Sequence, residues 1–399
     1  MKLNNIYKIK IIDEDNNGNG ITRIDNFVVF VKNALKDEDL EIKIIEINKH
    51  YAIAKIENII NPSKERINIE CPFNDKCGGC DFLHTTYEKE RSLKKTYLEK
   101  LFNRNINYLN TTNIYNYRNK VTLHVLNGIL GLYNDKTHNI CKINHCKLLK
   151  PKINEIINEL KNYKLDGIEE IIIKEINNKT MTIIKGTPNK TLNNLKTDSL
   201  YINNKLIKGE KTLQDNINNL KYNISPNSFY QINKEGMINI YDKAKEYIGI
   251  GEKLLDLYCG TGTIGIYLKD NFKEIIGCEI NDSSVKDANE NKKINKLNNI
   301  NFILSDAKKI KGNFDSIIVD PPRAGLSKDV INFLNNSNSS KIVYISCNPK
   351  TLKRDIDLLT NYELIDISCA DMFPRTKHVE TVCLLSKRQR RIYGGYYNA

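Results

Sequence analysis

The stretch Lys253-Leu254-Leu255-Asp256-Leu257-Tyr258-Cys259-Gly260-Thr261-Gly262-Thr263-Ile264-Gly265 decides the fold of this chain. Its pattern predicts a buried strand, a glycine turn and the start of a helix. Glycine lets the backbone approach a ligand closely at a helix N-terminus. The next expected strand, residues 274–279, ends in Glu279, an acid that can accept hydrogen bonds from ribose hydroxyls. The stretch therefore indicates an α/β fold that binds a nucleoside.

Further strands alternate with helices after this turn, which indicates a doubly wound, largely parallel sheet. The pattern D-L-x-C-G-x-G at residues 256–262 has only two glycines and fits a methyltransferase better than a dinucleotide-binding protein. The cofactor of a methyltransferase has no pyrophosphate that the turn would have to bind. S-adenosylmethionine is therefore favoured over a nicotinamide cofactor. The expected strand at residues 316–319 leads into Asp320-Pro321-Pro322-Arg323. Methyltransferases that act on amino groups carry an aromatic residue in place of Arg323, so methylation of an exocyclic amine is disfavoured.

The run Val343-Tyr344-Ile345-Ser346-Cys347-Asn348-Pro349 brings a cysteine to the end of a strand. Pro349 prevents the strand from continuing, so Cys347 is expected at the carboxyl edge of the sheet, where open α/β folds bind ligands. A thiolate that adds to C6 of uracil makes C5 nucleophilic enough to take a methyl group. We therefore predict that Cys347 is a nucleophile. The alternative, an inert buried cysteine, is our interpretation of Cys259, Cys278, Cys369 and Cys383.

This chemistry also needs a base, which removes the C5 proton so that the thiolate can leave. Glu380 is the candidate, because it stands at a loop-to-strand junction in the polar segment 371–382. A solvated surface acid is the alternative interpretation of Glu380. His378 is a second possible base, although a binding or structural role suits it better.

The N-terminal part of the chain carries a turn cluster at residues 16–20 and four runs rich in β-forming residues: 6–12, 27–31, 40–47 and 51–59. Short strands at this spacing predict a small β-barrel. Gly18-Asn19-Gly20-Ile21-Thr22-Arg23-Ile24-Asp25 resembles the start of a TRAM domain, an RNA-binding barrel related in shape to OB-folds. A generic barrel without RNA contacts is the alternative.

Three cysteines follow in C-x5-C-x2-C spacing, Cys71, Cys77 and Cys80, and Cys146 comes much later. Three thiols on a glycine-containing loop and one distant thiol can bind a tetrahedral metal or a cubane cluster. Zinc and iron–sulfur suit this spacing equally well. Radical S-adenosylmethionine chemistry is less favoured, since those enzymes typically use C-x3-C-x2-C. Cys141 could compete with Cys146 for the fourth position.

Three other segments have weaker signals. Residues 87–101 have helical composition, and their interspersed acids and bases indicate a solvated face. Tyr115-Asn116-Tyr117-Arg118-Asn119-Lys120 interleaves basic and aromatic residues, which suits phosphate contacts and base stacking. Residues 225–233 either form a turn that caps the expected helix 234–247 through Asn233, or place Gln231 beside a cofactor.

The whole chain is basic: 399 residues carry Lys+Arg 61 against Asp+Glu 48, a net charge of +13. This excess favours a polyanionic partner, although a chain rich in Ile, Lys and Asn throughout could be basic without one. No apolar run approaches the length of a membrane span, and the first residues lack the apolar core of a signal peptide. We therefore expect a cytoplasmic protein without membrane contact.

Taken in order, these motifs resemble one family from about residue 6 to residue 386. The family is the bacterial RNA uracil-C5 methyltransferases, in the branch that carries both a TRAM domain and a 4Fe–4S cluster. The motifs that carry the resemblance are Cys71, Cys77, Cys80 and Cys146, residues 256–260, 320–323, 346–349 and 378–380.

The resemblance implies four regions. Residues 1–62 would be the TRAM-like barrel and residues 63–228 a central α+β iron–sulfur and RNA-binding domain. Residues 229–386 would form a Rossmann-like S-adenosylmethionine-dependent methyltransferase domain, followed by a basic, Tyr-rich tail at 387–399. Residues 83–112 are expected to pack on the methyltransferase domain.

The resemblance also implies roles for single residues. The cysteines at positions 71, 77, 80 and 146 would hold the 4Fe–4S cluster, with Cys347 as nucleophile and Glu380 as base. The residues that would contact S-adenosylmethionine are Gln231, Tyr258, Glu279 and Asp320. Members of this branch mostly act on 23S ribosomal RNA, so the expected product is 5-methyluridine in that RNA. We expect the enzyme to be a monomer.

Three alternatives stay open. A transfer-RNA branch of the family lacks the cluster, so transfer RNA is the second candidate substrate. Cytosine-C5 methylation is less favoured, because the Asp-Ala-Pro-Cys motif usual in those enzymes is absent from the sequence. A non-catalytic iron–sulfur protein that binds RNA would bind no S-adenosylmethionine.

Overall fold

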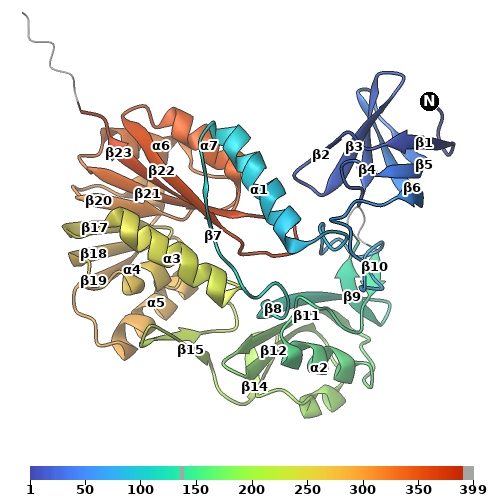
Figure 1. The fold of residues 1–399 in the computed structure, drawn as a ribbon. Helices are drawn as coiled ribbons and strands as arrows, with labels where there is room; N and C mark the ends of the chain where they lie inside the picture. The colour runs from blue at the N-terminus through green and yellow to red at the C-terminus, as the bar shows by residue number, and fades with distance from the viewer. Residues whose placement is uncertain (135–138, 390–399) are drawn as a thin grey trace, which may run out of the picture.

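The computed structural model describes residues 1–134 and 139–389, which form three large sheets and one two-stranded sheet with their helices (Figure 1). Most of the tail predicted at residues 387–399 therefore lies outside the described residues. No helix in the described part of the chain has both the length and the apolar character needed to cross a membrane.

The N-terminal sheet has six strands in the order β1-β5-β6-β4-β3-β2. Their bounds are β1 (Ile6–Lys10), β2 (Asp13–Glu14), β3 (Asn19–Ile24), β4 (Phe27–Lys32), β5 (Asp39–Ile47) and β6 (Tyr51–Asn61). Alternate residues of β4 and β5, such as Val29, Val31, Leu40 and Ile42, are fully buried in its core. The four predicted strands are confirmed, and the polar β2–β3 hairpin was not predicted, because the Asn- and Gly-rich turn hides its pattern.

The middle sheet has the strand order β10-β9-β8-β11-β12-β13-β14. Its elements are β8 (Lys120–Leu126), β9 (Ile129–Tyr133), β10 (Ile140–Lys142), α2 (Pro151–Leu160), β11 (Ile168–Ile176), β12 (Lys179–Gly186), η1 (Lys190–Asn194), β13 (Ser199–Ile202) and β14 (Lys205–Lys208). Asn177 and Asn178 join β11 to β12 with φ of 47° and 60°, as asparagine in a tight hairpin turn permits. Helix α2 buries Ile153, Ile156 and Ile157 against this sheet.

The C-terminal sheet has eight strands in the order β19-β18-β17-β20-β21-β23-β22-β7. Its main elements are α3 (Lys234–Ile248), β17 (Gly251–Leu257), α4 (Thr263–Tyr267), β18 (Phe272–Glu279), α5 (Asp282–Ile294), β19 (Ile300–Leu304), η2 (Ala307–Lys309), β20 (Ser316–Val319), α6 (Lys328–Asn336), β21 (Lys341–Ser346), α7 (Pro349–Leu358), β22 (Tyr362–Ala370) and β23 (Glu380–Lys387). The neighbouring strands β19, β18, β17, β20 and β21 are parallel to one another. Strand β23 runs antiparallel to both of its neighbours, β21 and β22. The predicted doubly wound, largely parallel sheet is confirmed, as is the N-cap Asn233, whose side chain accepts the N–H of Gly236.

Two earlier segments also pack against this C-terminal sheet. Helix α1 (Tyr87–Phe102) lies beside α7 in Figure 1, and β7 (Asn107–Leu109) pairs in parallel with β22. Leu98, Phe102 and Ile106 join the hydrophobic cluster under α6 and α7. The hairpin β15 (Leu213–Ile217) and β16 (Leu220–Ile224) packs against α5 on the other face. Helix α1 and strand β7 therefore pack with the C-terminal sheet although they come much earlier in the chain.

The prediction of a solvated face for this helix is wrong at two positions. Glu90 and Lys94 are 0% and 1% exposed in α1. Their charges are compensated by each other at 2.7 Å and by Asp371, which lies 3.0 Å from the Lys94 ammonium. A buried charge is tolerated when it is paired and hydrogen-bonded, and these partners come from a segment far along the chain.

Candidate active site

The glycine turn after β17 faces open space at the carboxyl edge of the sheet. Gly260 has φ of +54°, and a Cβ built on it meets no atom within 4 Å. At the end of β18, Glu279 accepts the N–H of Gly260 at 3.1 Å and those of Ile280 and Asn281 at 2.9 and 2.8 Å. Three backbone donors hold this carboxylate beside the turn, as a ribose-binding acid requires.

Asp256, the first residue of the motif, holds the other side of the same turn by a hydrogen bond. One carboxyl oxygen accepts the N–H of Gly265 at 3.0 Å, and the other is buried without a hydrogen-bond partner among the described residues. Burial raises the pKa of Asp256 to about 8, and the charges of Asp320 and Glu279 add to this effect. The open space over the turn leaves room for a bound cofactor at this edge. Sequence reasoning assigned no role to Asp256, although it begins the motif.

The structure brings three of the four predicted cofactor residues to this edge. Tyr258 lies in the turn with φ of +65°, Glu279 faces Gly260, and Asp320 follows β20 with its N–H on the carbonyl of Leu257. Burial raises the pKa of Asp320 to about 7. The fourth, Gln231, precedes α3, and its carbonyl accepts the side-chain N–H of Asn119 at 2.9 Å.

Cys347 lies between β21 and α7, where Asn348 caps the helix and Pro349 occupies its first turn. Its thiol is half-buried and lines a cavity, unlike the four cysteines interpreted as inert, which are all buried. Burial and, to a smaller extent, the carboxyls of Glu380 and Asp320 raise the pKa of Cys347 to about 11, against the opposing effect of the Arg323 guanidinium. The thiol is therefore protonated in the free protein at neutral pH.

Glu380 is the first residue of β23 and is 4% exposed, so the alternative of a solvated surface acid is wrong. Burial and the neighbouring Asp320 hold its pKa well above the usual range. A carboxyl with a raised pKa in a dry site is suited to proton transfer near neutral pH. Glu380 and Asp320 both raise the pKa of the Cys347 thiol, so the three groups lie close together.

The cavity at Cys347 has a volume of about 670 Å³ and cationic walls. Arg118 and Lys120, from the basic and aromatic string of the sequence, line it together with Lys377. Arg323 donates to Nδ1 of His378 at 2.9 Å. Burial lowers the pKa of His378 to about 4, with the Arg323 charge as a second cause, so this imidazole is neutral and a weak base. Sequence reasoning missed this Arg323–His378 contact.

The predicted metal-binding cysteines also line this cavity: Cys71, Cys77, Cys80 and Cys146. Burial, with smaller effects from Cys146, Cys141 and Cys71, raises the pKa of Cys77 to about 11, so these thiols are neighbours. Cys141 is buried in β10 within the core of the middle sheet. Within residues 1–134 and 139–389, no three His, Cys, Asp or Glu side chains are placed to hold one metal ion.

Comparison with known proteins identifies the family. A family model described as tRNA (Uracil-5-)-methyltransferase matches residues 190–312 and 304–388, and a TRAM domain model matches residues 2–56. A Clostridium acetobutylicum protein named as an uncharacterized RNA methyltransferase is 33% identical over 452 residues, which cover 97% of this chain and 98% of the relative. The chain belongs to the tRNA (uracil-5-)-methyltransferase family.

Other relatives of the tRNA (uracil-5-)-methyltransferase family agree with this. A Staphylococcus aureus protein with the same description is 32% identical over 445 residues, covering 96% of this chain and 98% of the relative. The crystal structure of Pyrococcus abyssi tRNA (uracil-54, C5)-methyltransferase in complex with S-adenosyl-L-homocysteine superposes with a TM-score of 0.82 at 24% identity. The superposition covers 95% of this chain and 100% of the Pyrococcus chain. The S-adenosylmethionine-dependent methyltransferase fold and the N-terminal TRAM domain are thus confirmed.

We expect Cys347 to be alkylated slowly in the free protein. A thiol whose pKa is about 11 rather than 9.0 contains about 100-fold less thiolate at pH 8, and only the thiolate reacts. The rate of iodoacetamide labelling, followed by mass spectrometry of the Cys347 peptide, should rise about tenfold per pH unit up to pH 10. A rate that levels off below pH 8 would contradict this environment. The Glu380→Gln variant, which removes a neighbouring acid, should be labelled faster than the wild type.

Proposed function

We propose that this protein methylates C5 of a uridine in 23S ribosomal RNA and so forms 5-methyluridine. One observation carries the proposal: the Cys347 thiol shares a cationic cavity with Arg323 and interacts with the buried acids Glu380 and Asp320, at the sheet edge that also bears the glycine turn. A nucleophile, a raised-pKa acid and a cofactor turn are the parts that this reaction needs.

The cofactor turn would hold S-adenosylmethionine, which supplies an electrophilic methyl group when bound. In the proposal, Glu279 accepts the ribose hydroxyls, and Gln231, Tyr258 and Asp320 hold the rest of the cofactor. Support comes from the open space over Gly260 and the three backbone donors that fix Glu279. The related Pyrococcus structure contains S-adenosyl-L-homocysteine.

The reaction then uses three side chains in sequence. Cys347 gives its proton to solvent in the cavity, and the thiolate Sγ forms a bond to C6 of uracil, which places electron density on C5 and on the ring carbonyl oxygen. Arg323, whose charge already favours the Cys347 thiolate, stabilises this negative charge. C5 takes the methyl group. The Glu380 carboxylate then removes the C5 proton, the Sγ–C6 bond breaks, and Cys347 leaves as a thiolate.

Recognition of RNA would use all parts of the chain. We propose that the TRAM barrel, residues 1–62, and the central domain, residues 63–228, bind the RNA backbone, and that the cavity takes a uridine turned out of its stack. The cationic cavity wall formed by Arg118, Lys120 and Lys377 supports this. The enzyme would act in the cytoplasm as a monomer.

The four thiols on the cavity wall would hold a 4Fe–4S cluster. Their common place on the cavity wall and their mutual effect on the pKa values of Cys77 and Cys80 support the proposal. Anaerobically purified protein should contain about four iron and four sulfide per chain. Cys146→Ser should lose both, whereas the matched control Cys141→Ser should keep them. Zinc in the wild-type protein would contradict the cluster.

The experiment that tests the function is a map of 5-methyluridine in RNA from a strain that lacks this protein. A 5-methyluridine should disappear from 23S ribosomal RNA, and the wild-type gene should restore it while Cys347→Ala should not. The alternative substrate is transfer RNA, which the name of the Pyrococcus protein favours. Loss of 5-methyluridine from transfer RNA alone would establish that alternative. No change in either RNA would overturn the proposed reaction.

A further inference from the structure

Loop 371–379 connects β22 to β23 and leads directly into Glu380. Ala370 pairs with Glu380 across the two strands, so the loop begins and ends beside the proposed base. Phe373, Thr376 and His378 line the cavity that contains Cys347. The loop therefore forms part of the cavity wall and holds the backbone that leads into Glu380.

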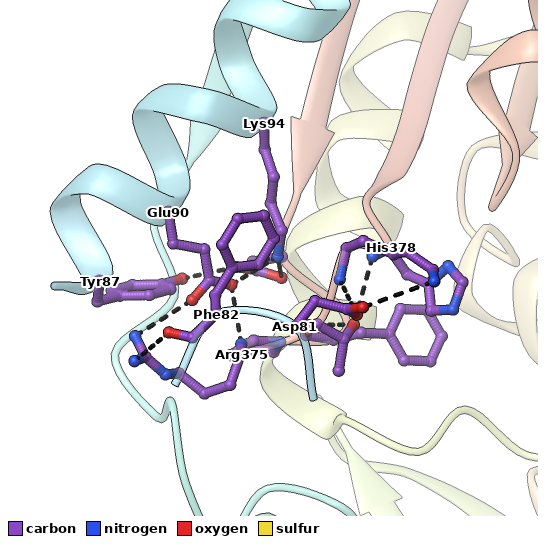
Figure 2. A network of polar contacts seen from close by, with 12 residues as sticks. Asp81, Phe82, Tyr87, Glu90, Lys94, Arg375 and His378 are labelled. Atoms are coloured by element: carbon purple, nitrogen blue, oxygen red, sulfur yellow. Dashed lines mark hydrogen bonds and ion pairs between the residues drawn. The ribbon is translucent and has the colours of Figure 1, made fainter. Parts of the chain in front are cut away.

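Arg375 lies at the centre of the loop and has a backbone conformation that residues other than glycine rarely adopt. It is 1% exposed and has φ of +69°, in the left-handed region. Its carbonyl accepts the N–H groups of Asp81 and Phe82 at 3.0 and 3.2 Å. Its guanidinium donates to the carbonyls of Phe82 and Thr85 at 2.6 and 2.8 Å, and to Glu90 at 3.2 Å (Figure 2).

The rest of the loop is bound to the same two segments, α1 and residues 81–85. Asp371 accepts hydrogen bonds from Lys94 at 3.0 and 3.1 Å and from Tyr87 at 3.1 Å. The N–H of Lys377 donates to the Asp81 carboxylate at 2.8 Å. Figure 2 shows these contacts as one continuous network from α1 to His378. Residue 81 follows Cys80 directly, so the network joins the cysteine-bearing loop to the loop that leads to the base.

We propose that Arg375 is a positioning residue that holds loop 371–379 so that Glu380 can reach the C5 proton. The inference rests on the proposed function and assigns Arg375 to one step of it. The guanidinium serves two carbonyls and one carboxylate at once, which a planar fork of five donors can do and an ammonium cannot. Loss of Arg375 therefore loosens the base, while Cys347, which is fixed by α7 on another strand, stays in place.

The test compares Arg375→Gln with the wild type in single-turnover and steady-state reactions with radiolabelled methyl donor and target RNA. We expect the first methyl transfer to stay within about twofold and turnover to fall by about ten- to a hundredfold, with KM for RNA unchanged. Methylated RNA bound covalently to protein should then accumulate on denaturing gels. Arg375→Lys should recover part of the turnover, and it replaces the glutamine variant should that fail to fold.

The matched control is Arg66→Gln, which breaks another arginine–glutamate pair, the partly buried Arg66 with the buried Glu38, outside loop 371–379. It should keep the wild-type ratio of first methyl transfer to turnover. Equal slowing of both steps in Arg375→Gln, or no effect on either, would overturn the positioning role.

A second readout does not depend on activity. Backbone amides of residues 371–382 should exchange with deuterium faster in Arg375→Gln than in Arg66→Gln or the wild type. Unchanged exchange would refute the inference. The proposed function fails separately if the wild-type protein transfers no methyl group to RNA. In that case the faster deuterium exchange in Arg375→Gln would still support the role of Arg375 in holding the loop.

Discussion

Cys347→Ala is expected to abolish methylation, with a fall in rate on the order of 10⁴ or more, because C5 of uracil stays too weak a nucleophile when no thiolate adds to C6. Binding should survive, because Cys347 is half-buried in a turn before α7 and its side chain supports no hydrophobic cluster. Methyl incorporation into target RNA measures the first effect. Equilibrium binding of RNA and of S-adenosylmethionine measures the second.

The matched control is Cys383→Ala. Cys383 is fully buried in β23, the strand antiparallel to β21, and we interpret it as inert. This variant should lose some stability through the cavity it creates and keep turnover per folded molecule. Turnover that persists in Cys347→Ala would refute the nucleophile. Loss of RNA binding together with activity would show that the thiol supports the fold instead.

Local patterns in the sequence were sufficient to predict the C-terminal sheet and the parts of the site that end its strands. The glycine turn, Asp320 and Cys347 each follow a strand and Glu279 ends one, and parallel strands bring their carboxyl ends to one edge. The predicted pattern thus places them together without any knowledge of long-range contacts. Burial of Glu380 was not predictable in this way, because its own segment is polar.

The contacts that hold the base-bearing loop were out of reach of sequence reasoning. Lys94 binds Asp371 across 277 positions, and Glu90 binds Arg375 across 285. A helix with interspersed lysines and glutamates has the pattern of a solvated surface helix whether or not such partners exist. Only the paired geometry shows that these charges are buried. The resemblance implied that residues 83–112, which include β7, pack on the methyltransferase domain, but no residue pattern predicted that β7 pairs with β22.

Glu380→Gln is expected to trap the enzyme on its RNA. Glutamine has the size of the buried carboxyl but cannot accept the C5 proton, so the bond between Cys347 and C6 cannot break. Addition and methyl transfer should continue, since the loss of an acid beside Cys347 favours its thiolate. The product should be a methylated, denaturant-stable protein–RNA adduct at about one per enzyme, with turnover reduced by about 10²-fold or more.

The pH dependence separates this role from a structural one. Burial and Asp320 raise the pKa of Glu380, so in the wild type the carboxyl is protonated below that pKa and cannot act as a base. Turnover of the wild type should therefore rise with pH through this pKa, and the residual release of product in Glu380→Gln should lack that limb. The double variant Cys347→Ala with Glu380→Gln should form no adduct, because the trapped bond is made by Cys347. Normal turnover in Glu380→Gln would assign the base to another group, for which the neutral His378 imidazole on the cavity wall is a candidate.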